Sequence, residues 1–129
     1  MPKTIDDLLA EARARFDRVT AEQAFGELQR GALLIDTRTH EQRRDAGSVP
    51  GAIVLDRTVF EWRLDPASPS HLPEVTDHDT RIIVLCRQGY SSSLAAASLQ
   101  ELGLHRATDV IGGFEAWIEA GLPVEPVTP

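Results

Sequence analysis

The chain of 129 residues contains one cysteine, Cys86, so it cannot form an internal disulfide bond. Its fold therefore does not depend on an oxidising compartment. No stretch of the sequence reaches the ~18 consecutive apolar residues that a membrane-spanning helix needs. The N-terminus is charged throughout and lacks the apolar core of a secretion signal. These absences predict a cytoplasmic protein that does not act on a membrane.

The sequence is also poor in the features of nucleic-acid-binding and metal-binding proteins. Its formal net charge of −7 at pH 7 argues against an extended nucleic-acid surface. Its four histidines show no metal-ligand spacing, and no low-complexity linker or internal repeat divides the chain. The length and the 42% hydrophobic content suit one domain with a buried core. We therefore expect a single globular domain without a metal site.

Short apolar runs alternate with helical patterns, which is typical of a parallel sheet covered on both faces by helices. Strands are predicted at 32–36, 52–55, 81–85 and 108–111, with a shorter one near Val19. Helices are predicted at 4–17, 21–30, 57–63, 92–102 and 114–120. This pattern divides the chain into an N-terminal helical extension at 1–17 and an α/β domain at 18–126.

Cys86 lies between the clearest predicted strand and the clearest predicted helix. In parallel α/β sheets the reactive groups gather at the carboxyl ends of the strands, and Cys86 occupies such an end. The loop that follows it consists of Arg87, Gln88, Gly89, Tyr90, Ser91 and Ser92. We expect these six residues to form a binding loop for a small anion.

The composition of this loop suits a stabilised thiolate. A free cysteine has a pKa near 8.5, which a helix N-terminus and an adjacent cation such as Arg87 lower. Gly89 allows the backbone to turn tightly, so that its N–H groups can surround the sulfur. Ser91 and Ser92 supply hydroxyls that either cap the helix or donate to sulfur. A lone cysteine is often only a small buried hydrophobe, but this combination favours a nucleophile of a sulfur-transfer enzyme.

Three segments in order make the chain resemble the rhodanese family of sulfurtransferases, from about Val19 to Val124. The first is Leu-Leu-Ile-Asp-Thr-Arg at 33–38 with Gly-Ser-Val-Pro-Gly-Ala at 47–52, where Ser48 replaces a frequent histidine. The second is Cys-Arg-Gln-Gly-Tyr-Ser-Ser at 86–92, which is similar to the family's Cys-x-x-Gly-x-Ser-Ser loop. The third is Gly-Gly-Phe-Glu-Ala-Trp at 112–117, followed by Gly-Leu-Pro-Val.

The resemblance implies a rhodanese-like doubly wound α/β domain with a five-stranded parallel sheet flanked by helices. It also implies the reaction: the Cys86 thiolate takes the sulfane sulfur of a donor such as thiosulfate and keeps it as a persulfide. A thiol, cyanide or protein acceptor then removes that sulfur, and no cofactor or metal takes part. Arg87 resembles the basic loop of the thiosulfate-using members.

Two further groups of residues are candidates for roles around the site. Asp36, Arg38 and Glu41 are expected to be structural, as an ion-pair cluster that fixes the loop after their strand. Arg57 and Arg63 lie in a segment that the resemblance places near the mouth of the site. Each is therefore a candidate contact for the sulfur donor, with surface ion pairing as the alternative.

Two other functions remain alternatives to a free-donor sulfurtransferase. A cysteine phosphatase or arsenate reductase has a Cys-x5-Arg loop, in which the arginine binds phosphoryl oxygens, but Ser92 occupies that position here. The second alternative is a persulfide carrier or protein-interaction module of the same fold. In that case the apolar stripe of the N-terminal helix, which includes Ile5 and Leu8, either packs on the domain or presents a surface to a partner.

Overall fold

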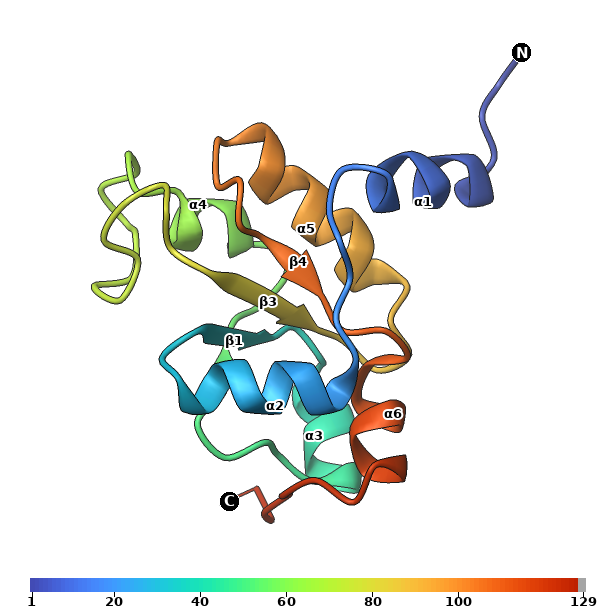
Figure 1. Cartoon of the computed structure of the whole chain (residues 1–129), viewed down its shortest axis with the longest axis vertical. Coiled ribbons are helices and arrows are strands. Elements are labelled where there is room, and N and C mark those ends of the chain that lie inside the picture. The colour runs from blue at the N-terminus through green and yellow to red at the C-terminus, as the bar shows by residue number, and fades with distance from the viewer. Residues whose placement is uncertain (128–129) are drawn as a thin grey trace.

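The structure is a computed structural model that describes residues 1–127 (Figure 1). The described residues form one parallel four-stranded sheet in the order β2-β1-β3-β4. Its strands are β1 (Leu33–Asp36), β2 (Ile53–Val54), β3 (Ile82–Leu85) and β4 (Thr108–Asp109). The α/β class and the parallel sheet predicted from the sequence are confirmed.

The sheet has four strands where the resemblance implied five. Val19 takes the fifth position but forms only an isolated parallel bridge with Val110. Its N–H donates to the Asp109 carbonyl at 3.2 Å, and the Ile111 N–H donates to the Val19 carbonyl at 2.8 Å. The bridge cannot lengthen into a strand because Thr20 already caps the next helix.

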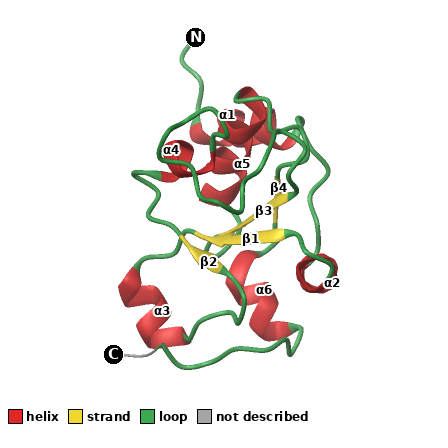
Figure 2. Ribbon diagram, turned by 90° about the vertical axis from the view of Figure 1, so that its left-hand side faces the viewer, coloured by secondary structure: helices red, strands yellow, loops and turns green. Residues whose placement is uncertain are grey.

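Helices lie on both faces of the sheet (Figure 2). One layer contains α1 (Ile5–Arg13), α4 (Phe60–Leu64) and α5 (Ser91–Glu101). The other contains α2 (Ala21–Gln29), α3 (His40–Ala46) and α6 (Gly113–Glu119). The helix α3 was not predicted from the sequence, although Thr39 gives it the same capping box that the sequence predicts for α2 at Thr20.

Strand β3 separates two apolar clusters, and all four of its residues are buried. Successive side chains of a strand point to opposite faces. Ile82 and Val84 therefore pack in the cluster that contains α4 and α5, whereas Ile83 and Leu85 pack in the cluster that contains α2 and α6. Because β3 is an interior strand buried on both faces, it positions the residue that follows it at the carboxyl end of the sheet.

Within its layer, helix α1 packs against α5 (Figure 1). Ala12 is buried, and Phe16 packs against the cluster under α5, whereas Ile5 and Leu8 stay exposed. Only the C-terminal part of the predicted apolar stripe is therefore covered. Across residues 1–127, none of the helices is both long and apolar enough to cross a membrane.

Candidate active site

Cys86 follows β3 directly and lies before the first turn of α5. Its thiol is free and buried, with 6% of the residue exposed. Two backbone amides of the loop donate to its sulfur: Gly89 at 3.2 Å and Ser92 at 3.4 Å. The second amide belongs to the first turn of α5, so the positive end of that helix also faces the sulfur. This arrangement directs two amide donors and the positive end of a helix at one sulfur.

Two opposing effects set the acidity of the thiol. Burial raises the pKa of Cys86 and is the largest single effect. Hydrogen bonds from the hydroxyls of Ser92 and Ser91 and from the amides of Ser92 and Gly89 act in the other direction. Together they outweigh burial, and the pKa of Cys86 lies below its ordinary value. The loop therefore favours the thiolate, which is the nucleophilic form of cysteine.

The hydroxyl of Ser92 has a second partner, the buried carboxylate of Asp109. Ser92 Oγ lies 2.7 Å from Asp109 Oδ2, and Ser93 Oγ lies 2.8 Å from the same oxygen. Ser92 has one hydroxyl proton, so Asp109 competes with the Cys86 sulfur for it. The backbone amides of Gly89 and Ser92 donate to the sulfur independently of that competition. Asp109 fixes both serines. The sequence offers one indication of this role, because a carboxylate inside a predicted buried strand needs a partner.

The turn between β4 and α6 holds the loop from the other side. Gly112 and Gly113 both have positive φ, at 75° and 59°. A Cβ on Gly113 would lie 2.5 Å from the Cys86 carbonyl oxygen and 2.7 Å from the Gly89 nitrogen. Only glycine lets the turn come this close to the cysteine loop. The close approach allows the Phe114 N–H to donate to the Cys86 carbonyl at 2.8 Å. The Gly-Gly pair in the sequence thus supports the cysteine loop.

The outer side chains of the loop are exposed and form its rim. Arg87 pairs with Glu115 at 3.3 Å, and Gln88 donates to the same carboxylate at 3.3 Å. Tyr90 is 59% exposed. A pocket of about 660 Å³ lies beside this rim, between α3 and α6. Arg87 lines it but Cys86 does not, so the pocket adjoins the thiol without enclosing it.

The predicted cluster after β1 contains a buried ion pair. Arg38 donates to Asp36 at 2.8 Å and to the Gly47 carbonyl at 3.0 Å, and both charged side chains are almost fully buried. The Arg38 guanidinium also lies 3.6 Å from the centre of the Phe114 ring. These contacts tie the loop after β1 to α6. Glu41 lies apart from the pair, exposed in the first turn of α3.

Arg57 and Arg63 are the two candidate contacts for the sulfur donor. Within residues 1–127, neither forms a hydrogen bond with the cysteine loop. Arg57 pairs with Glu61 at 2.8 Å, and Arg63 donates to the Ser70 carbonyl at 2.6 Å. Whether either arginine reaches a bound donor stays a prediction. In the same described part of the chain, no group of three or more His, Cys, Asp or Glu side chains is placed to hold a metal ion.

Comparison with known families gives a match to the rhodanese-like domain over residues 20–120. The chain belongs to the rhodanese family. It is 36% identical over 111 residues to the thiosulfate sulfurtransferase GlpE of Haemophilus influenzae, with 85% of this chain and 95% of that protein covered. It is 34% identical to the adenylyltransferase and sulfurtransferase UBA4 of Scheffersomyces stipitis, of which it covers 26%.

Among the solved structures similar to this chain, one matches it along almost its whole length. It is a protein of unknown function from Rhodopseudomonas palustris, described as a possible tyrosine phosphatase. The identity is 30% and the TM-score 0.84, with 97% of this chain and 99% of that chain covered. The similarity therefore includes the N-terminal extension, which lies outside the match to the rhodanese-like domain.

Proposed function

We propose that this protein is a thiosulfate sulfurtransferase that carries sulfane sulfur as a persulfide on Cys86. The observation that supports this most is the geometry of the thiol, with the Gly89 and Ser92 amides directed at the sulfur. The similarity to thiosulfate sulfurtransferases over 85% of the chain supports the choice of donor. An anionic donor also suits a loop whose amides and helix end favour negative charge.

In the first step the Cys86 thiolate attacks the outer sulfur of thiosulfate. A bond forms between Sγ and that sulfur, the sulfur–sulfur bond of the donor breaks, and sulfite leaves with the electron pair. The negative charge then resides on the terminal sulfur of the persulfide. The loop amides stabilise the thiolate before this step and the persulfide anion after it, as preorganised donors do for other anions.

In the second step a nucleophilic acceptor attacks the terminal sulfur. The bond between Sγ and that sulfur breaks, and the Cys86 thiolate forms again. A thiol, cyanide or a protein cysteine meets the chemical requirement. The acceptor must reach a thiol that is buried at the carboxyl end of β3, beside the exposed rim of the loop. Splitting the transfer into two displacements predicts ping-pong kinetics.

Phosphatase activity is the alternative raised by the description of the Rhodopseudomonas palustris structure. Phosphoryl transfer needs a cation that binds the equatorial oxygens, which is the role of the arginine in a Cys-x5-Arg loop. Ser92 stands at that position, and its hydroxyl donates to Asp109. The loop therefore lacks that group, and sulfur transfer fits its chemistry better.

The intact mass of the protein after incubation with thiosulfate tests the proposal. We expect a gain of about 32 Da, one sulfur atom, which reductant or cyanide removes. Cys86→Ala should show no gain. The absence of the added mass, with Cys86 still open to alkylation, would contradict thiosulfate as donor.

A turnover assay separates an enzyme from a persulfide carrier. An enzyme should form thiocyanate from thiosulfate and cyanide over many turnovers. A carrier would accept one sulfur from a protein persulfide and gain the same mass without sustained turnover of thiosulfate. Hydrolysis of p-nitrophenyl phosphate, measured in parallel, should not exceed that of Cys86→Ala.

A further inference from the structure

Two arginines from the N-terminal segment converge on one carbonyl of the cysteine loop. Arg13 Nη2 donates to the Gly89 carbonyl at 2.7 Å, and Arg18 Nη2 donates to the same oxygen at 2.9 Å. Gly89 therefore has partners on two sides: its carbonyl accepts from the two arginines, and its N–H donates to the Cys86 sulfur at 3.2 Å. The arginines therefore bind the residue that supplies one of the two amides on the thiol.

The same arginines connect to the serines that begin α5. Arg13 Nε donates to Ser93 Oγ at 3.0 Å. Arg18 forms an ion pair with Asp109 at 2.8 Å, and Asp109 accepts the hydroxyls of Ser92 and Ser93. One hydrogen-bonded network therefore holds the loop around the sulfur at two places, at Gly89 and at the start of α5.

The two arginines differ in their charge environment. Arg18 faces the buried carboxylate of Asp109, so its charge is largely compensated. Arg13 forms no ion pair with a carboxylate within residues 1–127, and its guanidinium lies 5.7 Å from the centre of the Tyr90 ring. Arg13 thus adds a positive charge beside a loop that must hold an anion.

The loop needs such a restraint because of its own sequence. Gly89 has a φ of 85°, and glycine visits alternative backbone conformations readily. Rotation of its peptide units would turn the amides away from the sulfur. Two charge-assisted hydrogen bonds to the Gly89 carbonyl oppose that rotation.

We propose that Arg13 is a positioning residue of the active site: with Arg18 it holds the Gly89 carbonyl outside the loop, so that the loop amides stay directed at Cys86. The extension at 1–17 is then part of the catalytic machinery as well as a packing element. The match to the rhodanese-like domain begins at residue 20, after both arginines. The inference rests on Cys86 being the nucleophile of the proposed function.

Arg13→Met tests this role, because methionine keeps much of the apolar stem and removes the guanidinium. The rate of Cys86 alkylation by iodoacetamide is measured against pH. We expect the pKa of Cys86 to rise in this variant, and the alkylation rate at a pH below both pKa values to fall about tenfold for each unit of that rise. Arg13→Lys should recover part of the loss, since it restores the charge without the two-pronged contact.

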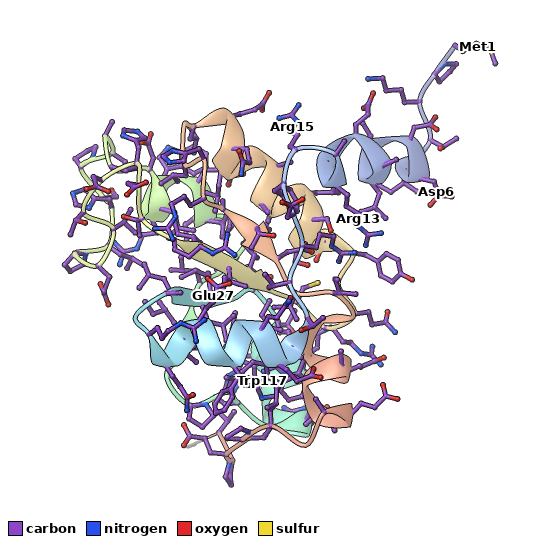
Figure 3. All side chains as sticks on the ribbon, in the orientation of Figure 1. Met1, Asp6, Arg13, Arg15, Glu27 and Trp117 are labelled. Atoms are coloured by element: carbon purple, nitrogen blue, oxygen red, sulfur yellow. The ribbon has the colours of Figure 1, made fainter. Side chains whose placement is uncertain are left out.

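Arg15→Met is the matched control. Arg15 lies two residues further along and pairs with Glu101 at 3.7 Å, at the opposite end of α5. Figure 3 shows the Arg13 and Arg15 side chains on opposite sides of this segment. Arg15→Met should leave the titration of Cys86 unchanged, and urea unfolding should show that both methionine variants are fully folded under the assay conditions.

Two results would overturn the inference. One is an Arg13→Met protein whose Cys86 titrates as in the parent protein. The other is an equal rise of the pKa in Arg13→Met and Arg15→Met, which would indicate a general loosening of α1. Alkylation needs no sulfur donor, so this test keeps its meaning even when thiosulfate proves to be the wrong substrate.

Discussion

At Cys86, the acidity of a single thiol depends on the balance between burial and hydrogen bonding. Burial disfavours the thiolate, whereas the hydroxyls of Ser92 and Ser91 and the amides of Ser92 and Gly89 favour it. The amides are held in place: one lies in the first turn of α5, and the other belongs to a glycine fixed by neighbouring chain segments. The reactivity of this residue is therefore a property of the loop that surrounds it.

This balance predicts how reactivity depends on pH. The thiolate fraction rises through the pKa of Cys86, which lies below its ordinary value. Alkylation should therefore reach its plateau at a lower pH than for a free cysteine, whose pKa is ~8.5. The rate is measured with iodoacetamide from pH 5 to 10, with a small thiol peptide as reference. A midpoint at or above that of the peptide would contradict the hydrogen-bonding argument.

Among the structural elements, the turn between β4 and α6 acts directly on the site. Its two glycines bring the start of α6 against the cysteine loop, and Phe114 and Glu115 donate backbone hydrogen bonds to the Cys86 and Arg87 carbonyls. A side chain at Gly113 would meet the loop backbone at distances that real Cβ atoms do not adopt. The turn therefore sets the position of the loop.

Gly113→Ala should displace the loop and abolish most sulfur transfer. It should also lower the free energy of unfolding by about 1–3 kcal/mol, as overpacking of a tight contact does. The measurements are thiosulfate turnover and urea unfolding.

Gly31→Ala provides the control for backbone strain alone. Gly31 also has positive φ, 102°, but a Cβ there meets no atom within 4 Å. This variant should lose some stability, of the order of 1 kcal/mol, and keep its turnover. Equal turnover in both alanine variants would show that the contact at Gly113 does not position the loop.

At the scale of the whole molecule, β3 joins two cores into one structure. Ile82 faces the core under α5, and Ile83 faces the core that contains Trp117 of α6. Trp117 is fully buried, contacts Phe25 of α2 at 5.8 Å between ring centres, and lies beside α2 in Figure 3. Because both layers depend on the same strand, we expect them to unfold together.

Ile82→Val and Ile83→Val test this cooperativity on opposite faces of β3. Each should lower the free energy of unfolding by about 1 kcal/mol, the usual effect of removing one buried methyl group. Trp117 fluorescence and far-UV circular dichroism should give coincident unfolding curves in both variants. Trp62 is exposed, so the fluorescence change reports mainly on Trp117. A fluorescence transition that Ile82→Val leaves unmoved would show that the layers unfold independently.

Local features of the chain were predictable because their signals lie within a few residues of one another. The apolar run before Cys86 predicts β3, and the capping box at Thr20 predicts the start of α2. The seven residues of α3 escaped prediction, since none of them is buried and the helix has no apolar stripe. The fifth strand at Val19 shortened to a bridge because the cap at Thr20 follows immediately.

The α/β class, the cysteine loop and its glycine can be read from the sequence, since each depends on a local pattern of residues. The distant groups that support the loop become visible only in the folded chain. Arg13 lies 76 residues from Gly89, and Asp109 lies 17 residues from Ser92, in a different element. No local pattern encodes such meetings. They follow from the packing of α1 on α5 and from the order of strands, which brings β4 beside β3.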